Sequence, residues 1–226
     1  MRYYPVFLDL NNKPVLVVGG GNVALTKVEG LLDAGAQVTV VSPELDDRME
    51  QLRDDGRFMF IHRKYEPGDL EGYELVFAAT DDGSDNHEVW KEGRERHIWV
   101  NAVDDIPNCD FIMPGIVRKG DLVIAISTSG TSPAMARKAR EDIEAFLTEE
   151  DAELLDLAAE IRRELRDSRV TVAACQHCQR NNNDVWNAAL DGEVKRLLKT
   201  NDRPAAKARI LNLLLSPSGQ HEAIRK

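Results

Sequence analysis

The stretch "VLVVGGGNVALTKVEGLLDAGAQVTVVSPEL", residues 15–45, restricts the fold of this chain more than any other feature. An apolar run of strand size leads into three glycines, and apolar residues at helical spacing follow. Gly35 stands where a helix usually ends, and a second apolar run begins shortly after it. This order predicts a strand, a tight turn, a helix and a second strand.

Similar apolar runs recur at residues 58–62, 75–79 and 98–101. Strand-sized runs that alternate with helical spacers are typical of a parallel sheet with helices on both faces. We therefore predict an α/β fold for residues 1–113, with a Rossmann-type doubly wound parallel sheet that binds a dinucleotide.

The pattern changes in residues 114–147. Two extended pieces flank a Lys119-Gly120 turn, and a helix follows for which Ser132 is a suitable N-cap and Pro133 a suitable first residue. These features predict a small α+β region.

Residues 148–226 are charged and rich in Leu and Ala. Helical patterns lie at 150–166, 184–199 and 203–215. We therefore predict a helical C-terminal domain.

The overall composition excludes several classes of protein. The formal net charge of −10 disfavours a nucleic-acid or anionic-membrane surface, because phosphate arrays repel an acidic protein. The sequence has no apolar span of about 18 residues, and its N-terminus lacks the basic and apolar regions of a signal peptide. Three cysteines are too few for a disulfide framework, which suits a reducing compartment. We expect a soluble cytoplasmic protein with no membrane and no nucleic-acid partner.

Gly19, Gly21 and Ala24 form a G-x-G-x-x-A pattern between a strand and a helix. In dinucleotide-binding domains the first glycine permits the tight turn, the second lets the backbone approach a pyrophosphate, and a small third residue permits close packing of helix on strand. The helix N-terminus then offers free N–H groups to the anion. We predict a dinucleotide site here; a turn that is merely tight is the alternative.

The acid that contacts the adenosine ribose usually follows the glycines by about 20 residues. Ser42 occupies that place and Glu44 lies two residues further on, so either side chain can accept a hydrogen bond from the ribose hydroxyl. Residues 38–47 contain no Arg or Lys to pair with a 2′-phosphate, which favours NAD over NADP. Lys27, one turn into the helix, is either an anion ligand or a solvated lysine.

Two other strand ends carry candidate residues. The run at 75–79 ends in Ala79 and Thr80, where ligands of open α/β sheets bind, although this segment also suits a helix cap. Asp104 follows the run at 98–101, near the expected nicotinamide position, where a proton acceptor is useful. A cap or turn role is the alternative for Asp104.

The loop "STSGTSP", residues 127–133, is rich in hydroxyl groups and leads into a helix N-terminus. Such a loop presents N–H and O–H donors that suit carboxylates or phosphates. An ordinary capped helix is the alternative. Cations nearby in the sequence that can add to an anion site are Arg118, Lys119, Arg137, Lys138 and Arg140.

Cys175, His177 and Cys178 suggest a metal or redox site. A single C-x-x-C without a second pair is, however, a weak zinc pattern. We therefore predict no resident metal site.

Six segments closely resemble, in order and spacing, the precorrin-2 dehydrogenase family, which includes the dehydrogenase module of siroheme synthases. They are "YPVFLDLNNKPVLVVGGGNVALTK", "GAQVTVVSPEL", "AATDD", "VNAVD", "FIMP" and "ISTSGTSPAMAR". The resemblance implies an NAD-dependent oxidoreductase that converts precorrin-2 to sirohydrochlorin in siroheme or cobalamin biosynthesis. It also implies a homodimer, with residues 114–147 as the dimerisation region and the tetrapyrrole bound between this region and the cofactor domain.

The resemblance also assigns roles to individual positions. Asn22 and Val23 match cofactor-binding residues after the glycine turn, and Pro43 and Glu44 match those after the second strand. Asp104 matches the catalytic aspartate, and Thr128 stands where some members carry a serine that touches the substrate. With the hydroxyl-rich loop and its cations taken as the site for the substrate carboxylates, the expected substrate-binding residues are Ser127, Thr128, Thr131, Ser132 and Arg137.

Two alternatives stay open at this point. Some relatives also insert ferrous iron into sirohydrochlorin, so a bifunctional dehydrogenase and ferrochelatase is one. The other, from a different class, is an NAD-sensing regulatory module in which nucleotide binding changes assembly without turnover. The hydroxyl-rich loop and its neighbouring cations disfavour this sensor, because nucleotide sensing does not need them.

Overall fold

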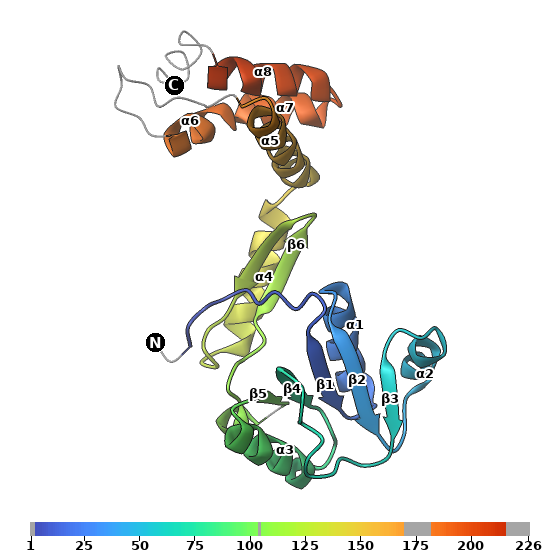
Figure 1. The fold of residues 1–226 in the computed structure, drawn as a ribbon. Coiled ribbons are helices and arrows are strands. Elements are labelled where there is room, and N and C mark those ends of the chain that lie inside the picture. The colour runs from blue at the N-terminus through green and yellow to red at the C-terminus, as the bar shows by residue number, and fades with distance from the viewer. Residues whose placement is uncertain (1–2, 104, 170–181, 216–226) are drawn as a thin grey trace. The chain divides into compact units, whose positions relative to one another are not determined.

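The structure, a computed structural model, describes residues 3–103, 105–169 and 182–215 (Figure 1). These residues form two compact units. The N-terminal unit contains the residues up to Met113 together with Ser129–Thr131, and the C-terminal unit contains the rest. The finer division into three domains at residues 113 and 147 stays a prediction.

The N-terminal unit is built on a five-stranded parallel sheet in the order β3-β2-β1-β4-β5. This order confirms the predicted doubly wound α/β fold. The strands are β1 (Pro14–Val18), β2 (Gln37–Ser42), β3 (Met59–His62), β4 (Leu75–Ala78) and β5 (Trp99–Ala102).

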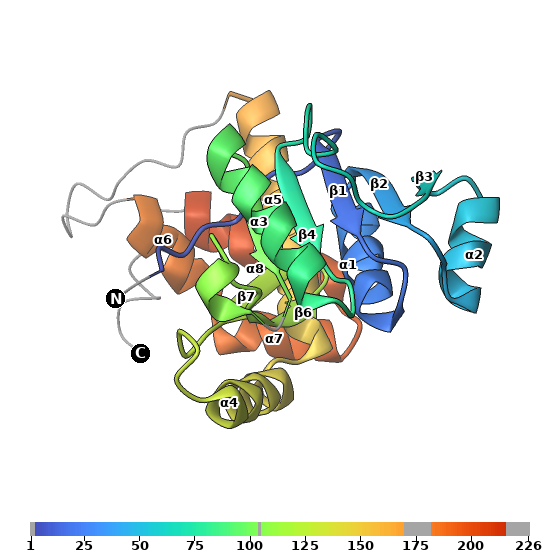
Figure 2. The ribbon, with the colours of Figure 1, turned by 90° about the horizontal axis from the view of Figure 1, so that it is seen from below.

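Both faces of this sheet are buried, as a parallel sheet requires. Val15 and Val17 of β1 belong to one apolar core, and Leu16 and Val18 belong to the other. Helices α1 (Asn22–Asp33) and α2 (Asp47–Asp54) contribute to the first core. Helix α3 (Gly83–Arg96) contributes to the second, and Figure 2 shows it on the viewer's side of β4. A short 3-10 helix, η1 (Ile106–Asn108), follows β5.

The C-terminal unit begins with an antiparallel hairpin of β6 (Gly115–Lys119) and β7 (Leu122–Ile126). Helix α4 (Pro133–Phe146) follows. As predicted, Ser132 caps this helix, with its Oγ accepting a hydrogen bond of 3.2 Å from the Met135 amide, and Pro133 is its first residue.

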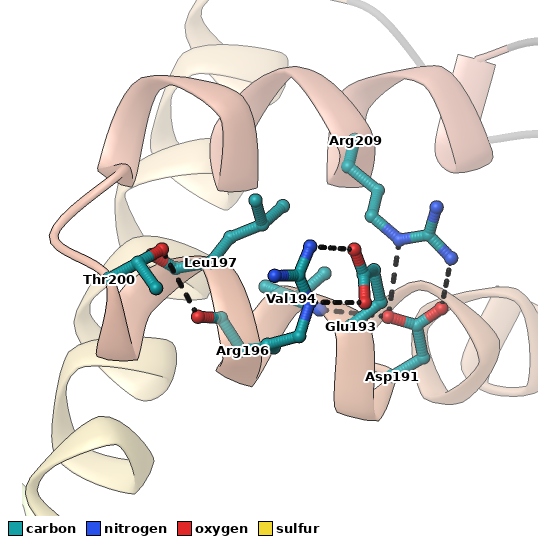
Figure 3. Close-up of polar contacts among 7 residues, drawn as sticks. All are labelled: Asp191, Glu193, Val194, Arg196, Leu197, Thr200 and Arg209. Atoms are coloured by element: carbon teal, nitrogen blue, oxygen red, sulfur yellow. Dashed lines mark hydrogen bonds and ion pairs between the residues drawn. The ribbon is translucent and has the colours of Figure 1, made fainter.

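Four further helices share an apolar core of their own. They are α5 (Glu149–Asp167), α6 (Asn182–Ala189), α7 (Gly192–Lys199) and α8 (Arg203–Leu215). The sequence pattern predicted one helix over residues 184–199, and the structure has two. Asp191 separates them because its extended backbone interrupts the helix and its carboxylate caps α7 at the Val194 amide, 3.0 Å away (Figure 3).

Within the described parts of the chain, no helix combines the length and the apolar character needed to cross a membrane.

Candidate functional site

The three consecutive glycines after β1 have different surroundings. Gly19 has a φ of +124°, and a Cβ on it would lie 2.2 Å from the Ala79 carbonyl oxygen. A Cβ on Gly20 would lie 2.0 Å from the Glu44 carbonyl oxygen. A Cβ on Gly21 would meet nothing within 4 Å. The first two glycines therefore let neighbouring loops pack on the turn, whereas the third leaves open space.

Gly21 is also the N-cap of α1. Because it has no side chain, the first-turn amides of α1, including those of Asn22 and Val23, have no capping group. Ala24 is fully buried where α1 packs on the sheet, as the glycine pattern predicted. An anion can therefore approach the helix N-terminus through the space above Gly21.

A cleft of about 450 Å³ opens at this turn. It lies at the carboxyl ends of β1, β2 and β4, which is where open α/β sheets bind their ligands. The predicted cofactor residues that line it are Gly19, Gly21, Ser42, Pro43, Glu44, Ala79 and Thr80. Lining residues that the sequence did not single out include Gly20, Leu45, Asp46, Lys64, Tyr65 and Asp85.

The loop after β2 (residues 43–46) is held by its own hydrogen bonds. The buried Ser42 hydroxyl donates to the Glu44 carbonyl oxygen, 2.6 Å away, and the His62 Nε2 lies 2.8 Å from the Pro43 carbonyl oxygen. Glu44 is exposed. Of the two candidates for contact with the ribose hydroxyl, Ser42 thus supports the loop, and Glu44 is an exposed residue of the cleft lining.

The β4–α3 loop (residues 79–82) has both of the features that the sequence left open. It lines the cleft, and it also caps a helix: the Asp82 carboxylate accepts from the Ser84 amide, 2.8 Å away. Hydrogen bonds from the Ser84 hydroxyl and amide lower the pKa of Asp82 below its usual value. Thr80 donates its hydroxyl within the loop, to the Asp82 carbonyl oxygen at 2.9 Å.

The β3–β4 loop (residues 63–74) brings Lys64 and Tyr65 to the cleft. The Tyr65 hydroxyl donates to the Glu92 carboxylate of α3, 2.5 Å away, and burial together with this carboxylate raises the pKa of Tyr65. No local pattern marks these residues, because their place depends on where the loop crosses the sheet.

The cleft is strongly acidic. Among its described lining residues, Lys64 is the only cation. The carboxylates in the lining belong to Glu44, Asp46, Asp81, Asp82 and Asp85.

Asp104, the predicted catalytic residue, lies outside the described residues. Further along the chain, Phe111 lies against β5, because the side-chain amide of Asn101 on β5 donates to the Phe111 carbonyl oxygen, 2.9 Å away. The Cys109 Sγ lies 3.0 Å from the Ala102 carbonyl oxygen. The Val103 amide donates to the Ala78 carbonyl oxygen (2.9 Å) and the Asp105 amide to the Ala102 carbonyl oxygen (3.2 Å), so both residues are held at the carboxyl end of β5.

The hydroxyl-rich loop belongs to the start of α4. The Thr128 hydroxyl donates to the Ser132 carbonyl oxygen (3.0 Å) and accepts from the Ser132 amide (3.2 Å). These bonds bring Thr128 and Ser132 together, while Ser127 and Thr131 are exposed.

The cations near this loop are paired along α4. Arg137 is exposed, and its Nε lies 2.9 Å from the Glu141 carboxylate. Arg140 pairs with Glu144 in the same i,i+4 geometry. Such surface ion pairs contribute little to stability, so the arginines can exchange these partners for another anion.

Within residues 3–103, 105–169 and 182–215, no cluster of His, Cys, Asp and Glu is arranged to hold a metal ion. Cys175, His177 and Cys178 lie outside these ranges.

The fold and the cleft define a Rossmann-type domain of the dinucleotide-binding class. In agreement, residues 6–115 match the family model described as "Putative NAD(P)-binding", and residues 119–145 match "Sirohaem biosynthesis protein central". Through both matches the chain is similar to siroheme synthases and precorrin-2 dehydrogenases, the family that its sequence resembles.

Individual relatives show this similarity. Siroheme synthase of Pseudoalteromonas translucida is 35% identical over 223 residues, which are 97% of this chain and 46% of that protein. Siroheme synthase 1 of Yersinia enterocolitica is 39% identical over 98% of this chain and 45% of its own length. The chain thus spans about half the length of these curated relatives. The solved structure of "SirC, precorrin-2 dehydrogenase" superposes with a TM-score of 0.74, at 25% identity, over 92% of this chain and 98% of that one.

Proposed function

We propose that this chain catalyses the NAD-dependent oxidation of precorrin-2 to sirohydrochlorin in siroheme or cobalamin biosynthesis. The observation that carries the proposal is the open space above Gly21 at the N-terminus of α1, in a chain that matches both the cofactor-binding and the central models. The cofactor, when bound, accepts a hydride from the macrocycle. The protein binds and orients the two reactants.

The proposed dinucleotide-binding groups line the cleft, except Asn22 and Val23, which follow the lining residue Gly21. The uncapped amides at the start of α1, with Asn22 and Val23, bind the pyrophosphate. Pro43 and Glu44 line the part of the cleft that holds the adenosine, and Glu44 accepts a hydrogen bond from the ribose hydroxyl. The backbone of Ala79 and Thr80 lines the cleft beside the glycine turn.

The charge of the cleft favours NAD over NADP. A 2′-phosphate would add close to two negative charges near Glu44 and the other lining carboxylates, with Lys64 as the one cation among the described lining residues. The repulsion weakens NADP binding relative to NAD.

Asp104 is the proposed general base. Oxidation of the macrocycle releases a proton as well as a hydride, and the Asp104 carboxylate takes up that proton. The assignment rests on the family resemblance and on the position of Asp104 immediately after β5.

The substrate's carboxylates are the proposed ligands of the loop at residues 127–132 and of Arg137. Ser127 and Thr131 are exposed, and the i,i+4 pair of Arg137 with Glu141 is weak enough to exchange for a substrate carboxylate.

A homodimer is the proposed assembly. None of the described residues of α4 is buried, and a two-stranded hairpin with one helix does not bury a core of its own. The large exposed apolar side chains of this region are Ile116, Met135 and Phe146. A second copy that covers these side chains completes the missing core.

The test is the formation of NADH from NAD and precorrin-2, followed by absorbance, with NAD binding measured in parallel by calorimetry. We expect both binding and turnover. Binding of NAD without reduction would favour the sensor and overturn the proposal. The same assay with ferrous or cobaltous ion, followed by the absorption spectrum of the macrocycle, tests for the additional chelatase activity.

A further inference from the structure

Helix α3 carries two polar residues on its buried face. Asn86 and Glu92 are 5% and 8% exposed, and they flank Val89, which is fully buried against the sheet. A buried polar side chain requires hydrogen-bond partners, so each must have a specific neighbour. Glu92 binds the Tyr65 hydroxyl and the Gly68 amide of the β3–β4 loop. The Asn86 side chain binds Thr80 of the β4–α3 loop.

Asn86 contacts three different atoms of Thr80. Its Oδ1 accepts from the Thr80 amide at 3.2 Å and lies 2.9 Å from the Thr80 hydroxyl. Its Nδ2 donates to the Thr80 carbonyl oxygen at 3.1 Å. The orientation of the amide group is unambiguous, because the Thr80 N–H can only donate and the Thr80 carbonyl can only accept. The side chain thus pairs with both main-chain groups of Thr80, as a neighbouring strand would.

This pairing fixes the wall of the cleft that meets the glycine turn. The carbonyl oxygen of Ala79, next to Thr80, lies where a Cβ on Gly19 would approach within 2.2 Å. The loop and the turn are therefore packed backbone to backbone. Any shift of Thr80 changes the shape of the cleft where the dinucleotide binds.

We infer that Asn86 is a positioning residue for the dinucleotide, an inference that rests on the proposed function. Asn86 does not line the cleft. It holds Ala79 and Thr80 in the conformation that binds the cofactor, and so contributes to cofactor affinity without touching the cofactor.

The substitution Asn86→Asp tests this role because it keeps the shape of the side chain and replaces only the Nδ2 donor with an oxygen. Its carboxylate oxygen would face the Thr80 carbonyl oxygen and repel it. Protonation of the new carboxyl restores a donor at the same place. We expect Asn86→Asp to raise the Kd for NAD about tenfold at alkaline pH, and the loss to shrink as the pH falls.

The kinetic constants separate positioning from general stability. The KM for NAD should rise with the Kd, while the KM for precorrin-2 stays at the wild-type value. Glu88→Gln is the matched control, because Glu88 is an exposed residue of the same helix, and it should bind NAD like the wild type. If Asn86→Asp does not fold, Asn86→Ser is used, which is too short to reach both main-chain groups of Thr80.

A folded Asn86 variant whose Kd for NAD stays within about twofold of the wild type at every pH would overturn the inference. The wild-type protein distinguishes this failure from failure of the proposed function. If the wild type binds NAD but does not oxidise precorrin-2, the proposed reaction is wrong while the positioning role still stands or falls on the Kd values. If the wild type binds no NAD, both are wrong.

Discussion

Gly20 and Gly21 are adjacent, yet a methyl group at each meets different surroundings. At Gly21 it enters open space at the N-terminus of α1, so Gly21→Ala should fold normally and weaken NAD binding about tenfold or more. At Gly20 it meets the Glu44 carbonyl oxygen at 2.0 Å, so Gly20→Ala should lower the free energy of unfolding by about 1–3 kcal/mol. Thermal unfolding and calorimetry with NAD distinguish the two. Equal effects of both substitutions on stability would contradict this view of the turn.

Asp104 is the residue on which the proposed chemistry depends. Asp104→Asn keeps the size of the side chain and removes the base, so kcat should fall about 100-fold or more while the Kd for NAD is unchanged. Steady-state kinetics and NAD titration of the same preparation check this. A turnover rate near that of the wild type would remove Asp104 from the mechanism.

Asp191 illustrates how one residue defines an element. It caps α7 and pairs with Arg209 of α8 (Figure 3). Burial alone would raise the pKa of Asp191, but the Arg209 guanidinium and the Val194 amide outweigh it and lower the pKa. A carboxylate whose pKa is lowered by folding stabilises the protein above its unfolded pKa of about 3.9, and this contribution is lost as the pH falls through the folded value.

Asp191→Ala should therefore destabilise the helical part of the chain by about 1–2 kcal/mol at neutral pH, with a smaller difference from wild type at acidic pH. Urea unfolding followed by circular dichroism measures both. Glu193→Gln is the control, because Glu193 pairs with Arg196 on the surface of the same helix. We expect this substitution to change the free energy of unfolding little. A pH-independent difference for Asp191→Ala would exclude the ionic contribution.

At the scale of elements, local sequence determined most of the N-terminal fold. The five apolar runs became the five strands, and the glycines and Ala24 occupy the predicted turn, because these features depend on neighbours in the chain. Lys64 and Asn86 were missed since their roles depend on where a loop and a helix face meet the cleft. The division between α6 and α7 was missed because helical spacing continues across Asp191, and only its capping bond marks the break.

For the whole molecule, the exposed apolar surface of α4 predicts self-association. Met135 and Phe146 are 58% and 79% exposed and lie about three helical turns apart, on one side of α4. The double substitution Met135→Glu and Phe146→Glu should convert a dimer into a monomer. Sedimentation velocity measures the change, and Met59→Glu, at a residue 71% exposed on β3, should leave the dimer intact. A double variant that stays dimeric would place the interface elsewhere.

The central claim is that a nicotinamide dinucleotide binds across the carboxyl edge of the parallel sheet. A crystal structure of the full chain with NAD tests it most directly. We predict the pyrophosphate over Gly21 at the start of α1, the adenosine beside Glu44, and the nicotinamide ring toward the end of β5. A dinucleotide bound at another place, or a cleft closed by its own side chains in the presence of saturating NAD, would contradict the account.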